Sequence, residues 1–404
     1  MSTSMLYHMM GIRGYRKVSE KFENGGMTVT IVQDRETCRC PQCQSANVIL
    51  KGGVCRRFRG IPIGRKPVWI RFRVPRMQCR DCGALRQAAL GFAEPRVSYV
   101  KAFGRYVLEL ADRMTIRDVA EHLGISWDVV KEIVKANLKR NFAKPRLKDL
   151  RQIAIDEISI GAGHRYLTIV LDLASGAVVY VGRGKGGDAL TDFWKRLRSS
   201  GAKIEAVGMD MSPAYLAAVT ANLRGAKIIF DRFHVMKLMN DALSDMRRAL
   251  YRDIKDNLGR QVLKGTRWLL LKRPENLDSK HDEPKRLAEA LRLNAPLATA
   301  YYLKEELYEF WEQEDYYQAE RFLLQWIESA EATKIRHLVK FAQTLRAHWS
   351  GLLNYYDYPI SSGPLEGTNN KIKTMQRQAY GYRDHEFFQL KIYALHKARY
   401  ALVG

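Results

Sequence analysis

Residues 153–181 read IAIDEISIGAGHRYLTIVLDLASGAVVYV, and the expected fold class is inferred first from these residues. It contains three short apolar runs, Ile153–Asp156, Tyr166–Leu171 and Ala177–Val181, joined by short polar connections. Runs of this length, rich in β-branched residues and bounded by turn residues, predict three strands, with Ser175-Gly176 forming the second turn.

The pattern after Val181 changes from strands alone to alternating helices and strands. We expect a helix at about 188–198, a strand that ends at Asp210, a helix at 213–223 and a strand at 226–230. Three strands followed by such an alternation indicate an α/β fold, with a mixed sheet covered on both faces.

Two carboxylates mark this sheet, Asp156 in the first strand and Asp210 at the carboxyl end of the fourth. If these strands are neighbours at the switch point of the sheet, the two carboxylates meet in one crevice. Carboxylate oxygens suit hard divalent cations such as Mg²⁺. The alternative is a pair of ordinary strand-end residues, although the apolar strand around Asp156 would not bury a carboxylate without a partner or a metal. Glu157 should point to the opposite face.

Asp231 and His234 open a helix directly after the fifth strand. They can support the crevice through hydrogen bonds, or they can form a purely structural pair, and the sequence leaves both interpretations open. Asp172, at the end of the second strand, is interpreted as a bystander.

The chain is strongly basic, with a formal net charge of +24 from 67 Lys and Arg against 43 Asp and Glu in 404 residues. Between Lys51 and Arg105 there are fourteen Lys or Arg and two carboxylates. This balance points to a polyanionic partner, nucleic acid before an anionic membrane surface, with a merely solvated basic face as the alternative. No apolar run of about 18 residues and no N-terminal signal is found, so we expect a soluble, cytoplasmic protein and no membrane partner.

All six cysteines lie between Cys38 and Cys82. The two CxxC pairs, Cys40/Cys43 and Cys79/Cys82, predict a structural Zn²⁺ in a zinc ribbon, with a strand at 68–74 and a hairpin around 61–64 between them. A disulfide framework is the alternative, which an intracellular chain disfavours. Cys38 and Cys55 are left as substitute ligands or small buried hydrophobes.

Residues 115–140, TIRDVAEHLGISWDVVKEIVKANLKR, predict a helix-turn-helix. Thr115 with Asp118 resembles a capping box, Gly124 makes the turn and Ser126 caps the second helix. This second helix, 127–138, would enter the major groove, and four exposed basic residues would contact phosphates: Lys131, Lys135, Lys139 and Arg140. A helical hairpin that serves only as a spacer is the alternative.

Residues 361–377 contain a third candidate carboxylate. Ser361-Ser362-Gly363-Pro364 is a helix-start signal, which places Glu366 in the first turn. Glu366, Asn370, Lys373 and Arg377 recur at helical spacing on one face, where a metal ligand would be followed by groups that track a phosphate backbone. Leu365, Ile372 and Met375 lie towards another side and are expected to pack on the sheet. The alternative is that Glu366 only favours the helix dipole.

Residues 240–349 are rich in helix formers and predict a helical insertion between the second and third carboxylates. In this insertion Trp268 follows Arg267, and its basic flanks suggest that the ring stacks on an unpaired base of DNA. A buried core tryptophan is the alternative.

The motifs together resemble the bacterial insertion-sequence transposases of the ISL-three type. The resemblance rests on the CPxC…CxxC ribbon, the helix-turn-helix, IDEIS, GMDMSPAY, DRFHV, KGTRWLLLKRPENL and SSGPLEGTNNKIKTMQRQAYGYRD, and it extends from Cys40 to about Arg399. The second CxxC pair, Cys79 and Cys82, is spaced more closely than in the family pattern. This departure concerns the assignment of Cys82 as the fourth zinc ligand.

The resemblance implies a DDE transposase on a ribonuclease-H-like core, with Asp156, Asp210 and Glu366 holding two Mg²⁺ (or Mn²⁺). It implies binding of terminal inverted repeats and target DNA as a homodimer or higher oligomer, in the bacterial cytoplasm at the nucleoid. The expected domains are a zinc ribbon at 1–98, a helix-turn-helix at 99–145, a catalytic domain at 146–239 and 350–404, and the insertion at 240–349. Rival interpretations are a DNA-binding regulator with an inactive nuclease fold, and a nuclease or resolvase that cuts without joining.

Overall fold

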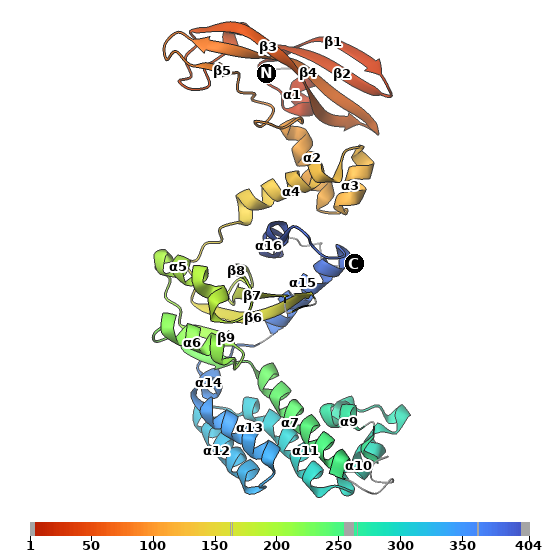
Figure 1. Cartoon of the computed structure of the whole chain (residues 1–404), viewed down its shortest axis with the longest axis vertical. Coiled ribbons are helices and arrows are strands. Elements are labelled where there is room, and N and C mark those ends of the chain that lie inside the picture. Colours follow the sequence, from red (N-terminus) through yellow and green to blue (C-terminus); the bar gives the residue numbers. More distant parts are fainter. Residues whose placement is uncertain are drawn as a thin grey trace. The chain divides into compact units, whose positions relative to one another are not determined.

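The computed structural model describes residues 5–161, 163, 165–253, 262–264, 266–361 and 363–396. This part of the chain divides into two compact units, and the division lies between Ala143 and Lys144. The elements of both units are labelled in Figure 1. None of the helices in these ranges is long and apolar enough to span a bilayer.

The first unit combines a sheet with a cluster of helices. Its helices are α1 (Met5–Met10), α2 (Lys101–Ala111), α3 (Ile116–Leu123) and α4 (Trp127–Phe142). Its strands are β1 (Tyr15–Glu23), β2 (Gly26–Gln33), β3 (Val48–Ile63), β4 (Lys66–Cys79) and β5 (Leu85–Gln87). The order is β1-β2-β4-β3, with β5 paired to β4. The predicted hairpin and strand are confirmed, because β3 and β4 are antiparallel and turn between Ile63 and Lys66.

The helix-turn-helix is formed by α3 and α4, and its caps are those that the sequence predicts. Thr115 and Asp118 form a capping box, Gly124 adopts the left-handed conformation (φ 60°), and the Ser126 side chain accepts a hydrogen bond from the N–H of Val129. Each cap satisfies backbone groups at a helix end, so these helix boundaries follow from local chemistry.

Arg59 of β3 joins the sheet to the helix-turn-helix within this unit. Its side chain is 7% exposed, and its guanidinium donates to the carbonyl of Leu123, at the end of α3, at 2.7 Å. Its backbone also bonds Ser98 and Val100. The boundary expected at residue 98 therefore falls inside one compact unit.

The second unit is built on a second sheet. Its strands are β6 (Gln152–Gly161), β7 (Arg165–Asp172), β8 (Val178–Arg183), β9 (Ala206–Met209) and β10 (Lys227–Phe230). The strand order is β10-β9-β6-β7-β8. Strands β6, β7 and β8 pair antiparallel, whereas β9 is parallel to both β6 and β10. The expected mixed sheet is confirmed.

Helices cover both faces of this sheet (Figure 1). One face carries Ile153, Ile155 and Val170 and packs against α5 (Thr191–Ser200) and α6 (Pro213–Asn222). The other face carries Ala154 and Ile158 and packs against α15 (Gly363–Gln378) and α16 (His385–Tyr393). Successive residues of β6 therefore point to opposite layers.

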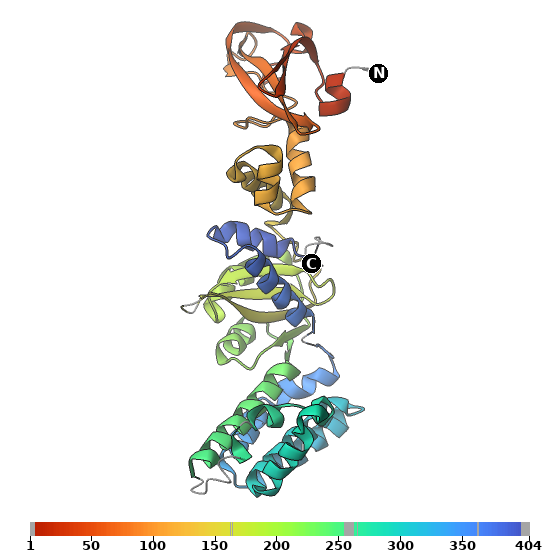
Figure 2. The ribbon, with the colours of Figure 1, turned by 90° about the vertical axis from the view of Figure 1, so that its right-hand side faces the viewer.

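Between β10 and α15 the chain forms a helical bundle, whose members lie side by side in Figure 2. They are α7 (Arg232–Asp253), α9 (Arg267–Leu271), α10 (Glu283–Arg292), α11 (Ala295–Leu307), α12 (Tyr316–Ala332), α13 (Arg336–Ala347) and α14 (Trp349–Leu353). Trp326, 1% exposed, lies in the bundle core, and its indole N–H donates to the carbonyl of Leu303 at 2.9 Å. The expected start of the insertion at residue 240 falls inside α7, which runs unbroken from the sheet into the bundle.

Candidate functional site

The pairing of β6 with β9 brings Asp156 and Asp210 together. The parallel ladder pairs Gln152 with Ala206 and Ala154 with Gly208. Two residues beyond the last of these pairs, each strand carries its aspartate. Since alternate residues of a strand share a face, both carboxylates lie on the side covered by α15. The expectation that these strands are neighbours is confirmed.

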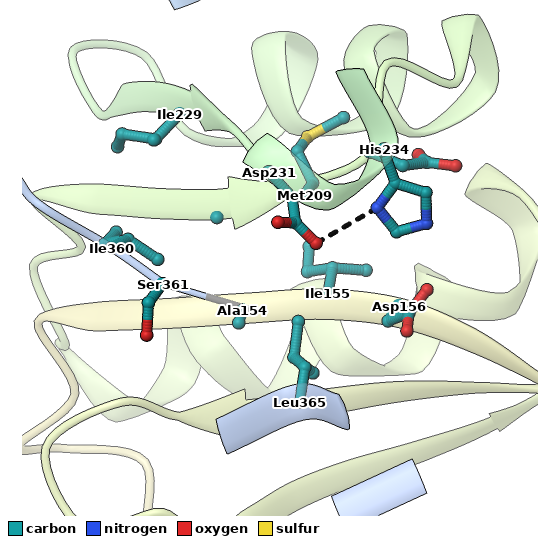
Figure 3. Close-up of a pocket in the computed structure, with 12 residues that line it drawn as sticks. Ala154, Ile155, Asp156, Met209, Ile229, Asp231, His234, Ile360, Ser361 and Leu365 are labelled. Atoms are coloured by element: carbon teal, nitrogen blue, oxygen red, sulfur yellow. Dashed lines mark hydrogen bonds and ion pairs between the residues drawn. The ribbon is translucent and has the colours of Figure 1, made fainter. Parts of the chain in front are cut away.

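The two aspartates line a small hollow, and Figure 3 labels Asp156 and most of the other lining residues. Its other lining residues are Ala154, Ile155, Gly208, Met209, Ile229, Asp231, His234, Ile360, Ser361 and Leu365. A side chain at position 208 would be obstructed, because a Cβ there would lie 2.8 Å from Cγ2 of Ile360. Glycine at this position therefore lets the segment that leads into α15 cross closely over β9.

Asp156 is half-buried, and each of its carboxylate oxygens accepts a hydrogen bond. The N–H of Glu157 donates to Oδ1 at 2.7 Å, and the Nδ2 amide of Asn369 donates to Oδ2 at 2.6 Å. Burial raises the pKa of Asp156 and the neighbouring Asp210 adds to this, although the hydrogen bonds and His234 oppose the shift. A cation in the hollow would stabilise the ionised carboxylate, so the donors here fit a hard divalent metal ion.

Asn369 is not among the site residues predicted above, although the sequence carries a signal for it. Asn369 lies four residues after Leu365 and three before Ile372, and both of these apolar side chains are buried against the sheet. A polar residue on the buried side of an amphipathic helix needs a partner, and here the partner is Asp156.

Glu157 and Asp172 lie outside the hollow. Glu157 pairs across the sheet with Thr168, whose hydroxyl is 2.8 Å from that of Tyr215 on α6, so Glu157 belongs to the opposite face, as expected. Burial raises the pKa of Glu157. Asp172 accepts hydrogen bonds from the N–H groups of Ala174 and Ser175, which makes it a turn residue.

Asp231 fixes both the start of α7 and the ring of His234. Its Oδ1 accepts from the N–H of Phe233 at 3.0 Å, and its Oδ2 is 3.1 Å from Nδ1 of His234 (Figure 3). Burial alone would lower the pKa of His234, but the hydrogen bond and charge of Asp231, with Asp156 and Asp210, raise it. The pair therefore holds the start of α7, and both of its side chains line the hollow.

Glu366 is exposed in the first turn of α15, next to Leu365, which lines the hollow. One turn later Asn369 reaches Asp156, so this part of α15 lies at the edge of the hollow. Asn370, Lys373 and Arg377 are exposed, as the helical spacing predicts. Leu365, Ile372 and Met375 are buried on the sheet, as expected.

In the first unit the two CxxC pairs meet at the base of the β3–β4 hairpin. The Sγ atoms of Cys40, Cys43, Cys79 and Cys82 all lie within 4.8 Å of one another. Cys40 and Cys82 are 3.7 Å apart, and Cys43 and Cys79 are 3.5 Å apart. Four thiolates around one Zn²⁺ lie about 3.8 Å apart in a regular tetrahedron, so this donor set fits a structural zinc, with Cys82 in place as a donor.

The backbone of the first knuckle favours a thiolate. N–H groups of Cys43 and Gln42 lower the pKa of Cys40 to about 7. The two remaining cysteines take no part in the cluster: Cys38 is 3% exposed, and Cys55 is exposed on β3. Cys38 is therefore a small buried hydrophobe, one of the two interpretations that the sequence left open.

Of the four basic residues of α4 that were predicted to be exposed, two are exposed and two are half-buried. Lys139 and Arg140 are exposed, and Arg140 donates to Asn137. Lys131 and Lys135 are half-buried instead of exposed, and the ammonium of Lys131 lies 5.7 Å from the ring centre of Trp127. The helical pattern predicted that both lysines are exposed, but the Lys131 side chain lies over the ring of Trp127 on the same helix.

Trp268 is on the surface of the bundle. Its side chain is 64% exposed, so the alternative of a core tryptophan is wrong; Leu269 and Leu270 occupy the core instead. The guanidinium of Arg267 lies 4.9 Å from the indole ring centre. The buried Lys304 donates to the carbonyl of Leu270 at 2.9 Å, which anchors the short helix that carries Trp268.

Comparisons with known proteins agree with these features. Residues 36–82 match a family described as zinc-finger of transposase IS204/IS1001/IS1096/IS1165, and residues 88–136 match the helix-turn-helix domain of transposase family ISL3. Residues 153–392 match the DDE transposase domain of the same family.

Whole-length relatives exist as well. The chain is 32% identical over 381 residues to the transposase for insertion sequence element IS1001 of Bordetella parapertussis, which covers 92% of each chain. It is 28% identical over 389 residues to the transposase for IS1557 of Mycobacterium tuberculosis, covering 89% of this chain and 86% of that one. The Drosophila P element transposase strand transfer complex is a distant solved structure, 12% identical with a TM-score of 0.36 over 75% of this chain and 92% of that one. A zinc ribbon, a helix-turn-helix and a DDE domain in this order, with a relative matched over nearly its full length, place the chain in the ISL3 family of insertion-sequence transposases.

Proposed function

We propose that this transposase cleaves and joins DNA at the ends of an insertion sequence through Asp156, Asp210 and Glu366. The observation that carries the proposal is the pairing of β6 with β9. It brings Asp156 and Asp210 together on the face of the sheet that is covered by α15, the helix that bears Glu366. The sheet supports it, because three antiparallel strands followed by two parallel ones, in the spatial order 3-2-1-4-5, correspond to a ribonuclease-H-like core. The bundle is then an insertion in that core.

The three carboxylates would hold two Mg²⁺ or Mn²⁺ ions, which supply a Lewis acid on each side of the scissile phosphate. The residues orient the reacting groups. In cleavage, a water oxygen forms a bond to phosphorus, the bond from phosphorus to the 3′ oxygen breaks, and a 3′-hydroxyl is released. In joining, this hydroxyl attacks a target phosphodiester and displaces a 3′ oxygen there. Asn369 holds Asp156 in place, and Asp231 with His234 supports the site from the α7 side.

DNA contacts are assigned to both units. The zinc ribbon and α4, with Lys131, Lys135, Lys139 and Arg140, would bind the terminal inverted repeats. Along α15, Asn370, Lys373 and Arg377 would follow the phosphate backbone away from the carboxylates, and Arg267 with Trp268 would contact distorted DNA. Because the two ends of the element must be cut and joined together, the protein would act as a homodimer or higher oligomer on DNA. It would do so in the bacterial cytoplasm, at the nucleoid.

The test is the joining of a pre-cleaved terminal-repeat end to plasmid DNA in the presence of Mg²⁺. Glu366→Gln should abolish cleavage and joining while DNA binding is kept, because the amide removes a negative ligand and leaves the exposed surface unchanged. Glu386→Gln, a matched change in the first turn of α16, should stay active.

Three outcomes would overturn the proposal. An active Glu366→Gln variant would remove Glu366 from the triad. Cleavage without joining by the wild-type protein would indicate a nuclease or resolvase, and tight end binding without either reaction would indicate a regulator.

A further inference from the structure

Tyr380 stands out at the C-terminal end of α15, the helix that carries Glu366. Its side chain is fully exposed, at 101% of the reference value. Its φ angle is +50°, and among the described non-glycine residues with positive φ it is the aromatic one. The left-handed conformation crowds the Cβ of any L-residue, so this backbone is strained.

The strain arises from how α15 ends. The N–H of Gly381 donates to the carbonyl of Gln376 at 2.9 Å, and the N–H of Tyr380 donates to the carbonyl of Arg377 at 3.0 Å. This is a helix-terminating turn of the Schellman kind, in which the left-handed position is usually Gly and sometimes Asn. Here that position is occupied by a large aromatic residue that gains no contact with the rest of the described chain to offset the strain.

The residues that follow the turn are anchored in the protein, so the backbone that carries Tyr380 is held in place on its C-terminal side. Two residues later, the ring of Tyr382 stacks on Phe388 with centroids 4.6 Å apart, and burial raises the pKa of Tyr382 to about 12. Asp384 then caps α16 by accepting from the N–H of Phe387 at 3.0 Å. Tyr382 is thus a structural aromatic, in contrast to Tyr380.

Tyr380 also lies close to the end of the exposed strip of α15 that is proposed to contact DNA. The strip consists of Glu366, Asn370, Lys373 and Arg377, in steps of four, three and four. Tyr380 follows three residues after Arg377, in the turn just beyond the end of α15 at Gln378. From Glu366 to the end of α15 at Gln378 the helix spans about 18 Å, and Tyr380 lies two residues beyond, so the separation corresponds to roughly five to six base steps of DNA at about 3.4 Å each.

We propose that Tyr380 stacks on an unpaired base of the transposon end, about five to six nucleotides from the scissile phosphate. An exposed ring at the end of a phosphate-tracking strip offers a flat apolar surface, and base stacking on such rings is tolerant of sequence. The strained backbone is then retained because it directs the ring away from the protein and towards DNA. This inference rests on the proposed function of the α15 strip.

The experiment places 2-aminopurine at successive positions of a terminal-repeat duplex and measures its fluorescence when the full-length protein binds without added metal. Quenching is expected at about five to six nucleotides from the cleavage point. Tyr380→Phe should keep the quenching. Tyr380→Asn should lose it and weaken end binding by about tenfold, while the melting temperature rises by about 2–4 °C because Asn accepts the left-handed conformation.

Tyr317 provides the matched control, since it is 75% exposed on the bundle helix α12. Tyr317→Ala should leave the quenching and end binding unchanged. Unchanged end binding and quenching in Tyr380→Asn would overturn the proposal, as would a fall in its melting temperature. If Tyr380→Asn binds DNA normally but loses self-association, the ring contacts a second copy of the chain, and the proposal fails.

The fluorescence assay measures DNA binding without strand cleavage or joining, so its result does not depend on Asp156, Asp210 and Glu366. Quenching together with an active Glu366→Gln variant would refute the proposed catalytic residues and leave the stacking intact. An inactive Glu366→Gln variant without quenching would refute the stacking alone.

Discussion

Replacing Asn369 with alanine tests whether the hydrogen bond to Asp156 supports metal binding. The substitution removes the Nδ2 donor that lies 2.6 Å from Oδ2 of Asp156. The carboxylate keeps the N–H of Glu157 on its other oxygen, so it stays in the hollow but gains freedom to rotate. The chain folds as before, because Oδ1 of Asn369 is buried and has no partner among the described residues, and the change removes this unsatisfied atom too.

The expected size of the effect of Asn369→Ala follows from the negative charge of the Asp156 carboxylate, which accepts the hydrogen bond. A hydrogen bond to an ionised group contributes about 1.5–3 kcal/mol, which corresponds to roughly 10- to 150-fold in an equilibrium constant. Loss of a group that orients a metal ligand lowers metal affinity or activity by about 10–100-fold. We therefore expect the Mg²⁺ concentration that gives half-maximal joining to rise by about 10–100-fold in Asn369→Ala, with DNA affinity unchanged.

The adjacent Asn370 is a matched control, since it has the same side chain but is exposed on the strip assigned to DNA. Asn370→Ala should weaken end binding by about fivefold, the equivalent of about 1 kcal/mol for one neutral hydrogen bond, and leave the Mg²⁺ titration unchanged. The assay is joining of a pre-cleaved end across an Mg²⁺ series, alongside a binding isotherm without metal. A wild-type Mg²⁺ dependence in Asn369→Ala, or a shifted one in Asn370→Ala, would refute the reasoning.

Two further predictions concern the zinc cluster and the surface of the bundle. Cys40→Ser should remove zinc, detected by elemental analysis, and should unfold the ribbon and weaken end binding while residues 144–396 keep their protease resistance. The reason is that structural zinc contributes about 10–16 kcal/mol, as much as a small domain's whole stability; wild-type protein without zinc would contradict this. Trp268→Ala should lower cleavage by about tenfold without a change in melting temperature, because the ring is 64% exposed. A large fall in melting temperature would show that the indole is needed for packing.

Much of the fold could be predicted from the sequence because the information is local. The capping box of Thr115 and Asp118 and the turn at Gly124 each depend on residues within one helical turn. The strands of the second sheet carry runs of apolar residues long enough to identify, and the CxxC spacing identifies metal ligands without knowledge of the fold. The helical spacing around Glu366 likewise predicted which side chains of α15 are buried.

Tertiary structure decided what depends on contacts between distant segments. Asn369 and Asp156 are 213 residues apart, so the helical spacing that places Asn369 on the buried side of α15 could not show that its partner is Asp156. Trp268 has an apolar side chain among leucines, yet the packing of α9 left it on the surface. The length of β6 was also underestimated, since the run that ends at Asp156 continues to Gly161 through pairing with β7.

The physical distinction is between short-range and long-range terms. Capping, turn geometry and the spacing of the cysteine pairs depend on residues only a few positions apart, so the helix ends and the four clustered cysteines could be predicted from the sequence alone. Burial and strand register are settled by what the rest of the chain brings to a surface. Only the tertiary structure therefore decided that Asp156 and Asp210 share one face, that Asn369 holds the first of them, and that Trp268 and Tyr380 are exposed.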